Sequence, residues 1–278
     1  MIMNGKEVAL KIKNKLIEQI QKLEQKPGLV VIQVGADPAS SIYVKAKAKL
    51  AHEIGYYFEH ITFDENATEA EIITKIEELN QDDKINGIIV QLPIPKHLDA
   101  MKIINKIKPT KDIDGLTKLN AGALLTTNTG LVSCTPKGIM TILKEYAIDL
   151  NGKNVVIVGR SNLVGKPLIS LCLEQNATVT ICHSKTDNLA KYTKDADILI
   201  VAVGKKGLIT GDMVKENSVV IDVGINRVGK SIFGDVEYDT VAPKASFITP
   251  VPGGVGPMTT ISLMENVLIS YNMMKKGE

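Results

Sequence analysis

Short apolar runs alternate with amphipathic stretches along the first third of the chain. The run "GLVVIQVG" at 28–35 is typical of a buried strand, and residues 38–54 carry apolar side chains at helical spacing. A strand, a helix and a strand are predicted next at 56–63, 68–80 and 86–93. Strands that are joined through helices pair in parallel. The sequence therefore predicts an α/β fold built on a parallel sheet.

The same alternation starts again in the second half of the chain. Helices are expected near 98–107 and 136–147, separated by a polar loop "KPTKDIDG" at 108–115. Further strands are expected in the segments 151–168, 177–184, 197–204 and 218–226. A final helix at 258–275 has one broad apolar face, formed by Met258, Ile261, Met264, Val267, Leu268 and Tyr271. Two α/β units are the expected organisation.

Charge and cysteine content exclude several classes of protein. The 278 residues carry a formal net charge of +2, with no long block of like charge, so no nucleic-acid surface is expected. Cys134, Cys172 and Cys182 form no C-x-x-C pair and are expected to be free and buried. The N-terminal segment resembles an amphipathic helix rather than a signal peptide, and no apolar run is long enough to span a membrane. A cytoplasmic protein without a metal site is expected.

A glycine turn follows the first strand of the second unit. In "VVIVGRSNLVG" an apolar strand leads through Gly159 into a helix, the setting in which backbone amides hold a phosphate. Ser161 and Val164 stand where the G-x-G-x-x-G pattern has its later glycines, and Gly165 comes one residue late. By itself the turn therefore predicts either a nucleotide site or an ordinary tight turn of an α/β domain.

The end of the next predicted strand favours the nucleotide site. A pocket for NAD normally places an acidic residue about 20 residues beyond the glycines, whereas a 2′-phosphate needs cations and hydroxyls. Here that stretch reads "CHSKT", with Ser184, Lys185 and Thr186, and Arg160 lies in the glycine turn. The sequence thus predicts NADP rather than NAD as cofactor, although Lys185 alone could be an exposed surface lysine.

One lysine in "SSIYVKAKAK" (40–49) stands apart from its neighbours. Residues four apart share a helix face, so Tyr43 faces Lys47, while Lys45 and Lys49 point elsewhere. A partly buried lysine has a lowered pKa and can act as a general acid or base near neutral pH. The alternative is that Tyr43 and Lys47 merely pack side by side.

Polar residues also follow an apolar strand and occupy the next loop. Gln91 comes directly after "GIIV", at the carboxyl end of a strand, where open α/β sheets place ligands. Asp112 and Asp114 lie in "KDIDG", and a carboxylate there could accept two parallel hydrogen bonds from an amidine-like edge, the geometry that it offers to arginine or a pterin. The alternatives are a turn-capping role for Asp114 and a loop-backbone contact for Gln91.

Eight segments spread across the chain, taken together, resemble a known enzyme family. In order they read "PASSIYVKAK", "GIIVQLPIP", "KPTKDIDG", "CTPKG", "VGRSNLVGKP", "CHSKT", "VIDVGIN" and "TPVPGGVGPMT". The family is that of the bifunctional methylenetetrahydrofolate dehydrogenases and methenyltetrahydrofolate cyclohydrolases. The resemblance implies NADP-dependent oxidation of 5,10-methylenetetrahydrofolate to 5,10-methenyltetrahydrofolate, followed by hydrolysis to 10-formyltetrahydrofolate.

The resemblance also implies roles for individual residues. Tyr43 and Lys47 become the catalytic pair, Gln91 tunes Lys47, and Asp114 anchors the pterin. The substrate-binding residues implied are Tyr43, Gln91, Leu92, Asp114, Pro252, Gly253 and Gly254. The cofactor-binding residues implied are Gly159, Arg160, Ser161, Gly165, Ser184, Lys185 and Ile225. The chain departs from some relatives at Lys185, where they carry arginine, and it thereby loses the planar fork that grips a phosphate.

The resemblance finally implies an architecture. A folate-binding catalytic domain of residues 1–120 and 258–278 is expected, completed by the final helix, with a Rossmann-like NADP domain at 121–257 and the active site in the cleft. A homodimer with two activities, without a synthetase region, is expected. Two other functions remain open at this point, a shikimate dehydrogenase-like oxidoreductase and a non-catalytic NADP-binding protein.

Overall fold

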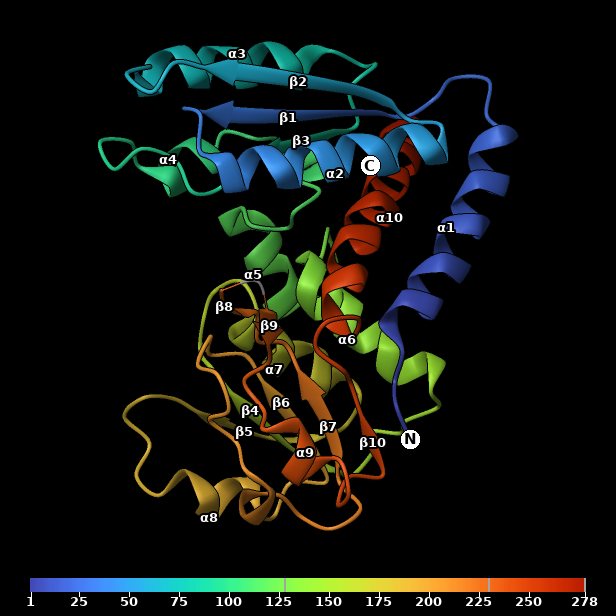
Figure 1. Ribbon diagram of the computed structural model, residues 1–278. Helices are drawn as coiled ribbons and strands as arrows, with labels where there is room; N and C mark the ends of the chain where they lie inside the picture. The colour runs from blue at the N-terminus through green and yellow to red at the C-terminus, as the bar shows by residue number, and fades with distance from the viewer. Residues whose placement is uncertain (128, 230, 278) are drawn as a thin grey trace. The chain divides into compact units, whose positions relative to one another are not determined.

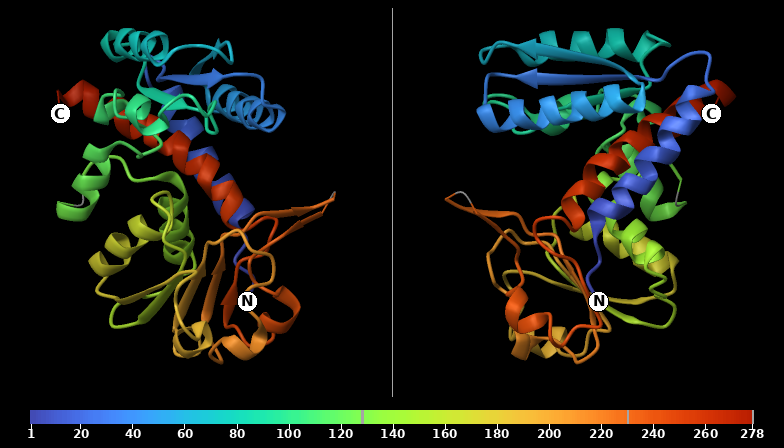
Figure 2. Two further views of the ribbon diagram at one scale, coloured as in Figure 1. Left: turned by 90° about the vertical axis from the view of Figure 1, so that its left-hand side faces the viewer. Right: turned by 45° about the vertical axis from the view of Figure 1, so that its right-hand side comes forward.

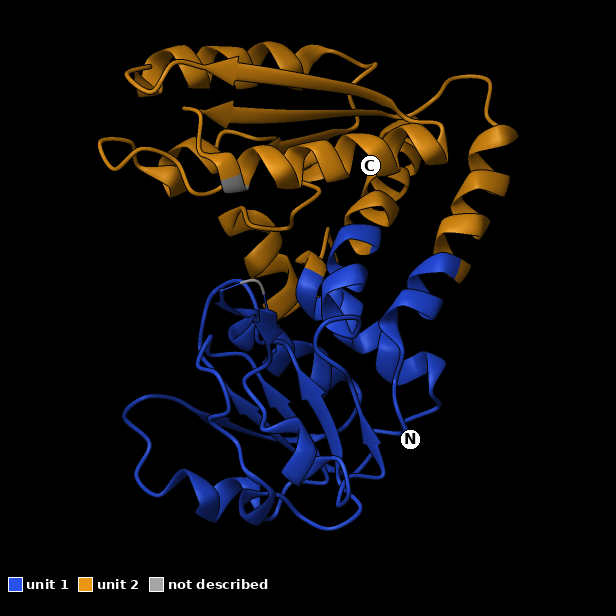
Figure 3. Cartoon of the chain, viewed as in Figure 1, with its two compact units in different colours: residues 1–10, 135–261 blue, residues 11–134, 262–278 orange. Residues whose placement is uncertain are grey.

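The computed structural model describes residues 1–127, 129–229 and 231–277 (Figure 1). The chain divides into two compact units, which Figure 3 colours separately. Unit 1 contains residues 1–10 and 135–261, and unit 2 contains residues 11–134 and 262–278. Both units draw on segments that are far apart in the sequence. The domain boundaries expected from the sequence stay a prediction.

The sheet of unit 2 has β1 (Gly28–Val34) at its centre. In the described residues β1 pairs in parallel with β2 (Tyr57–Phe63) on one side and β3 (Gly87–Val90) on the other. Every residue of β1 is buried, which is why its sequence is continuously apolar instead of alternating. The parallel sheet predicted from the alternating pattern is confirmed for this unit, although β3 is shorter than the predicted strand at 86–93.

Helices cover both faces of this sheet. Capping residues define the starts of the two long ones: Asp37 caps α2 (Pro38–Ile54), and Thr68 forms a capping box with Glu71 at α3 (Glu69–Gln81). Side chains of α3 and of the short α4 (Ala100–Ile104) share one apolar core with β1 and β3. Figure 2 shows α2 on the opposite side of the sheet from α3.

The loop after α4 is tied to the carboxyl end of α3. It begins with the 3-10 turn η1 (Pro109–Lys111) and is followed by α5 (Lys118–Thr126), a helix that the sequence pattern did not predict. Lys111 is only 2% exposed, and its Nζ donates hydrogen bonds of 2.9 Å to the Leu79 carbonyl and 2.7 Å to the Asp82 carbonyl. The buried ammonium thus satisfies carbonyls that the end of a helix leaves without partners.

The sheet of unit 1 is also parallel, with the strand order β10-β7-β6-β4-β5 in the described residues. These strands are β4 (Asn154–Val158), β5 (Thr178–Cys182), β6 (Ile198–Val201), β7 (Val219–Asp222) and β10 (Phe247–Ile248). The chain runs from β4 to β5 on one side and then crosses to β6 on the other side. That reversal is the topological switch point at which doubly wound sheets bind ligands.

Shorter elements complete unit 1. The helices are α7 (Gly165–Glu174), α8 (Leu189–Thr193) and α9 (Tyr238–Val241), with the 3-10 turn η2 (Gly211–Met213). The strands β8 (Asn226–Val228) and β9 (Ser231–Phe233) form an antiparallel hairpin that the sequence did not predict. Its short strands lack the apolar alternation by which a strand is recognised.

Three further helices each contain one of the positions in the sequence at which the chain passes from one unit to the other. They are α1 (Gly5–Gln21), α6 (Cys134–Glu145) and α10 (Val255–Lys276). The predicted apolar face of α10 is buried, and all three cysteines are buried and form no disulfide, as expected. Within unit 2, the Tyr56 hydroxyl donates a 2.8 Å hydrogen bond to the Met264 carbonyl, so α10 helps to complete that unit. In the part of the chain that the structure describes, no helix has the length and apolar character needed to cross a membrane.

We expect Lys111→Met to lower the free energy of unfolding by about 1–3 kcal/mol, because one buried and one partly buried carbonyl lose their donor. Methionine keeps much of the volume of the side chain, so packing changes little. The matched control is Lys108→Met at an exposed position of the same loop, which should change the free energy by less than about 0.5 kcal/mol. Urea unfolding followed by circular dichroism measures both, and equal values for the two variants would contradict this role of Lys111.

Candidate active site

Lys47 lies on α2 with its ammonium group against Gln91. Its Nζ donates a hydrogen bond of 2.6 Å to Oε1 of Gln91. Gln91 directly follows β3 and is 9% exposed, and its Nε2 donates to the carbonyl of Leu92 at 2.7 Å. Because its amide nitrogen is already engaged, Gln91 presents its oxygen to Lys47 in a defined orientation. The structure thus brings Lys47 together with the carboxyl end of β3.

The neighbouring lysines on α2 point into solvent. Lys45 and Lys49 are exposed, and Lys49 forms a 3.9 Å ion pair with Oε1 of Glu53 one turn later. Lys47 is half-buried, and Tyr43 lies one turn before it with its ring exposed. The helical spacing therefore separated the buried lysine from the two solvated ones correctly.

Opposing electrostatic effects act on Lys47 and Asp114. Burial lowers the pKa of the Lys47 ammonium, and the nearby charges of Asp114 and Cys134 partly oppose that shift. Burial raises the pKa of the Asp114 carboxyl, against which the charge of Lys47 and a hydrogen bond from the Cys134 thiol act. A lysine whose pKa is lowered by burial is available as a neutral amine closer to physiological pH.

Asp112 and Asp114 have different surroundings, although they are two residues apart. Asp112 is 1% exposed. Its carboxylate accepts hydrogen bonds from the Leu116 amide at 3.2 Å, the Thr117 amide at 2.7 Å and Asn120 Nδ2 at 2.9 Å. It is therefore occupied in shaping the loop, while Asp114 is the carboxylate whose charge acts on Lys47. The structure assigns the two aspartates of "KDIDG" to separate tasks.

Sequence reasoning missed two residues that border this site. Cys134 was expected to be a small buried hydrophobe, but its Sγ donates to the Ile113 carbonyl at 3.4 Å. Hydrogen bonding by the same thiol lowers the pKa of the Asp114 carboxyl. Asn266 on α10 donates from Nδ2 to the carbonyls of Ile113 at 2.8 Å and Val132 at 2.9 Å. The polar asparagine inside the apolar face of α10 was the signal that could have revealed this contact.

The glycine turn of unit 1 has the backbone of a phosphate-binding turn. Gly159 follows β4 with φ +129°, and a Cβ there would come within 2.2 Å of the Ala202 carbonyl oxygen. A Cβ on Gly165 would come within 2.0 Å of the Gly159 carbonyl oxygen, so both positions need glycine. Helix α7 begins at Gly165, and its N-cap Val164 makes no side-chain hydrogen bond. This turn suits a phosphate, because its glycines let an anion approach the backbone closely and the N-terminus of a helix carries a partial positive charge.

The "HSKT" segment turns back at the carboxyl end of β5. The register pairs Val158 with Cys182, so the glycine turn and this segment follow adjacent strands at the same edge of the sheet. The Thr186 hydroxyl accepts a 2.8 Å hydrogen bond from the His183 amide, which closes the turn. Three exposed polar side chains are presented at this edge, those of Arg160, Ser184 and Lys185. Ser161, in the glycine turn, is exposed too, and its Oγ accepts from the Val164 amide at 3.1 Å.

The remaining predicted residues also belong to unit 1. Ile225 follows β7 and is 55% exposed, which is unusual for an apolar side chain of that size. Pro252, Gly253 and Gly254 form a turn that is held to the chain start, because the Gly253 carbonyl accepts from the Lys6 amide at 3.2 Å. That these residues and Lys47 belong to one active site stays a prediction.

Two protein-family models match the chain. Residues 3–114 match the catalytic domain of the tetrahydrofolate dehydrogenase/cyclohydrolase family, and residues 133–275 match its NAD(P)-binding domain. The chain belongs to this family. The matched ranges contain Lys47, Gln91 and Asp114 in the first domain and the glycine turn in the second.

Individual members of the family are similar to the chain over nearly its whole length. The bifunctional protein FolD of Acetivibrio thermocellus is 50% identical over 279 residues, covering 99% of this chain and 98% of that protein. The structure of the FolD enzyme of Campylobacter jejuni has a TM-score of 0.97 at 46% identity, with 99% of each chain covered. A Trypanosoma brucei enzyme crystallised with NADP and an inhibitor has a TM-score of 0.94 at 34% identity, covering 99% of this chain and 98% of that chain.

A shikimate dehydrogenase is a distant structural relative. The enzyme of Aquifex aeolicus has a TM-score of 0.55 at 14% identity, covering 91% of this chain and 98% of that chain. At this identity the likeness shows the fold alone. The shared fold explains why the strand and helix pattern also allowed a shikimate dehydrogenase-like interpretation.

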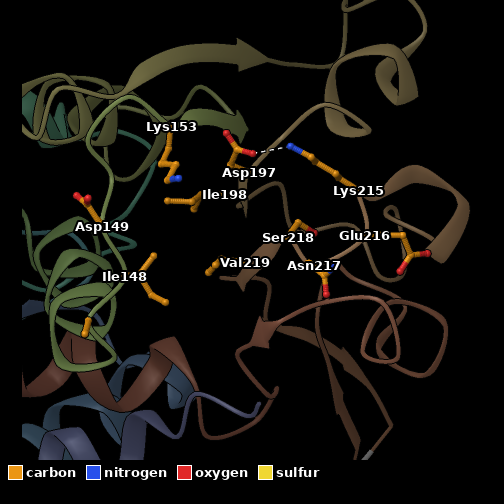
Figure 4. A pocket seen from close by; sticks show the side chains of 11 residues that line it. Ile148, Asp149, Lys153, Asp197, Ile198, Lys215, Glu216, Asn217, Ser218 and Val219 are labelled. Atoms are coloured by element: carbon orange, nitrogen blue, oxygen red, sulfur yellow. Dashed lines mark hydrogen bonds and ion pairs between the residues drawn. The ribbon is translucent and has the colours of Figure 1, made fainter.

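Cavities in the family fold occur at both edges of the sheets. In unit 2 a cavity of about 370 Å³ is lined by residues that follow β1, β2 and β3, including Gly35, Glu65 and Pro93. In unit 1 a cavity of about 390 Å³ lies at the amino ends of β6 and β7, beside the 2.6 Å ion pair of Lys215 and Asp197 (Figure 4). The second cavity is at the edge opposite the glycine turn and so is not the nucleotide site. Among the described residues, no group of three His, Cys, Asp or Glu side chains could hold a metal.

We expect the pKa of Lys47 to lie below the ordinary value for a lysine, because burial disfavours its charged form. Asp114→Asn should lower the pKa of Lys47 further, since the negative charge that raises it is removed. Carbon-13 NMR of the lysine Cε resonances during a pH titration measures these values. A Lys47 midpoint at the ordinary value for a lysine, or a higher midpoint in Asp114→Asn than in the native protein, would contradict the electrostatic account.

Proposed function

We propose that the chain oxidises 5,10-methylenetetrahydrofolate to 5,10-methenyltetrahydrofolate with NADP, and then hydrolyses the product to 10-formyltetrahydrofolate. The observation that carries this proposal is the 2.6 Å contact of Lys47 with Gln91 beside Asp114, in a chain that belongs to the dehydrogenase/cyclohydrolase family. Tyr43, Lys47, Gln91 and Asp114 are the proposed catalytic residues.

The oxidation requires positioning of the substrate, without a general base. The substrate carries a one-carbon bridge between two nitrogens, and loss of a hydride from that carbon leaves an amidinium cation stabilised by both nitrogen lone pairs. Bound NADP supplies the hydride acceptor. The chain's own residues orient the bridge and bind the pterin, for which the half-buried Asp114 carboxylate offers two acceptor oxygens. Leu92, Pro252, Gly253 and Gly254 are further proposed substrate contacts.

The hydrolysis requires proton transfer, and Lys47 is suited to it. Water adds to the methenyl carbon and gives up a proton, which the neutral amine of Lys47 accepts. The resulting carbinolamine then breaks its bond to N5, which takes a proton from the Lys47 ammonium as the hydroxyl loses its own. The net reaction consumes one water and releases one proton. Gln91 holds Nζ in place, and the lowered pKa of Lys47 makes both proton steps accessible near neutral pH.

We expect Lys47→Met to abolish most cyclohydrolase activity while some dehydrogenase activity remains, so that the methenyl compound accumulates. Proton transfer typically contributes about 10²–10⁴-fold to a rate. Lys45→Met and Lys49→Met are matched controls on the same helix and should keep native rates. Methenyltetrahydrofolate absorbance at matched NADP concentration measures the partitioning. If Lys47→Met hydrolysed methenyltetrahydrofolate at the native rate, Tyr43 and Lys47 would only pack side by side and would not catalyse the reaction.

NADP is the cofactor that the charges of unit 1 favour. Arg160, Ser184 and Lys185 are exposed at the edge where the glycine turn fits a phosphate, and no acidic residue occupies "HSKT" to bind a ribose hydroxyl. Gly159, Ser161 and Gly165 are the proposed pyrophosphate contacts, with Ile225 beside the nicotinamide.

We expect a clearly higher kcat/KM with NADP than with NAD, and Arg160→Ala should narrow the difference. A charge-assisted hydrogen bond to the 2′-phosphate contributes about 1.5–3 kcal/mol, on the order of ten- to a hundredfold. Lys153→Ala, at the opposite edge of the same sheet, is the control and should keep the native ratio. Initial rates with both cofactors test this, and equal kcat/KM values in the native enzyme would contradict it.

Two alternative functions are distinguished by the same absorbance measurement. A shikimate dehydrogenase-like enzyme would reduce NADP with a hydroxy acid, and a non-catalytic NADP-binding protein would show no turnover. Neither would form methenyltetrahydrofolate from methylenetetrahydrofolate and NADP. Family membership and the Lys47–Gln91 pair support the folate reaction over both.

We also propose a cytoplasmic homodimer, with a folate-binding domain of residues 1–120 and 258–278 and an NADP domain of residues 121–257. The exposed edge of unit 2 supports self-association, because β2 is one of the two outer strands of its sheet in the described residues and carries an exposed Tyr57. An outer strand presents unpaired backbone groups that a second copy can pair with.

We expect size-exclusion chromatography with light scattering to give twice the chain mass of 30.1 kDa. Dilution should shift the protein toward the single-chain mass if the interface is reversible. A single-chain mass at all protein concentrations would contradict the dimer and would leave the folate chemistry unaffected.

A further inference from the structure

One buried carboxylate joins two loops of unit 1. Asp235 precedes α9 and is 0% exposed. Its oxygens accept hydrogen bonds from three successive amides, of Val203 at 2.7 Å, Gly204 at 2.9 Å and Lys205 at 2.8 Å. Asn226 is the first residue of β8, directly after the loop that follows β7, and its Nδ2 donates to Asp235 Oδ1 at 2.8 Å. The carboxylate therefore holds the loop after β6 and the loop after β7 at the same time.

A second carboxylate determines where the first one lies. Asp222 is the last residue of β7 and is buried. It accepts hydrogen bonds of 2.9 Å from the amides of Gly224, Asp235 and Val236. The backbone of Asp235 is thus bound to the end of a sheet strand, and its side chain is bound to the two loops.

Two glycines make room for these carboxylates. A Cβ on Gly234 would lie 1.8 Å from Asp222 Oδ2, and a Cβ on Gly224 would lie 2.3 Å from Asp235 Oδ1. Either side chain would displace a carboxylate from its amides. The segments "DVGIN" and "GDV" therefore encode one arrangement, although they are separated by the β8–β9 hairpin.

The two loops border the edge of the sheet where the glycine turn lies. The chain leaves β6 at Ala202, whose carbonyl oxygen packs against Gly159, and β6 and β4 are the strands at the topological switch point. Val203 and Ile225 project from the two loops and are 38% and 55% exposed. Exposed apolar side chains at this edge suit the flat face of an aromatic ring.

We propose that Asp235 is a positioning residue for the nicotinamide end of NADP, acting through the loops that carry Val203 and Ile225. This inference rests on the proposed function and names how its cofactor is held. Asp235 does not touch the cofactor. It orders both loops before binding, so that the free energy cost of ordering them is met during folding instead of during cofactor binding.

The test compares Asp235→Asn with Asp239→Asn, an exposed carboxylate on α9. In Asp235→Asn an NH₂ group replaces one acceptor oxygen and faces amide donors. The dissociation constant of NADPH, measured by fluorescence without folate, should rise on the order of ten- to a hundredfold. Amide hydrogen exchange at residues 203–205 should accelerate in the cofactor-free protein. Asp239→Asn should match the native protein in both measurements.

A split between the two activities separates positioning from general destabilisation. Hydrolysis of methenyltetrahydrofolate without added cofactor should stay native in Asp235→Asn, while the KM for NADP rises and the dehydrogenase kcat falls. Native NADPH affinity and native exchange at residues 203–205 in a folded Asp235→Asn would overturn the proposal. So would an equal loss of both activities.

A milder variant decides the question if Asp235→Asn does not fold. Asn226→Ala removes the link to the loop after β7 and leaves the Asp235 carboxylate on its three amides. It should weaken NADPH binding by severalfold, and an unchanged affinity would overturn the proposal. The proposed function is tested separately, and it fails if the native protein forms no methenyltetrahydrofolate. NADPH binding and hydrogen exchange do not depend on that reaction, so the role of Asp235 can still be measured.

Discussion

The hydrogen bond between Lys47 and Gln91 is the contact on which the site of unit 2 depends. It holds an ammonium group in a half-buried position where desolvation disfavours its charge. An uncompensated charge in such a place would be expelled or neutralised. The Asp114 carboxylate acts against that shift, so the amine stays titratable and ordered. The position of Lys47 follows from α2, whose start is defined by Asp37 and Pro38.

Buried carboxylates shape the loops of both units, and most of them do no chemistry. Asp112 in unit 2 and Asp222 and Asp235 in unit 1 each accept several amide hydrogen bonds at the end of a strand or in a loop. A carboxylate can accept about four hydrogen bonds, so one side chain can hold a loop that lacks regular backbone pairing. Asp114 differs because a cation lies beside it.

Much of the fold could be predicted from the sequence, because the signals concerned are local. The bounds of α2 agree with the pattern over 38–54, and the buried face of α10 agrees with its apolar spacing. Elements with weak local signals were missed, namely α5 and the hairpin of β8 and β9. The two hairpin strands have three residues each and α5 has no distinct apolar face, so none of them shows the period by which an element is recognised. The helical spacing also separated Lys47 from its exposed neighbours, since a helix face is a local property.

The sequence by itself determined the repeated strand and helix order, the glycine turn and the half-buried lysine, because periodicity and backbone sterics act between near neighbours. Tertiary structure alone decided that Asp112 shapes its loop while Asp114 acts on Lys47, and that Asn266 from α10 joins the same loop. It also decided that Asp235 spans two loops. The physical reason is that the role of a buried polar group is set by the donors and charges around it, and these come from distant parts of the chain.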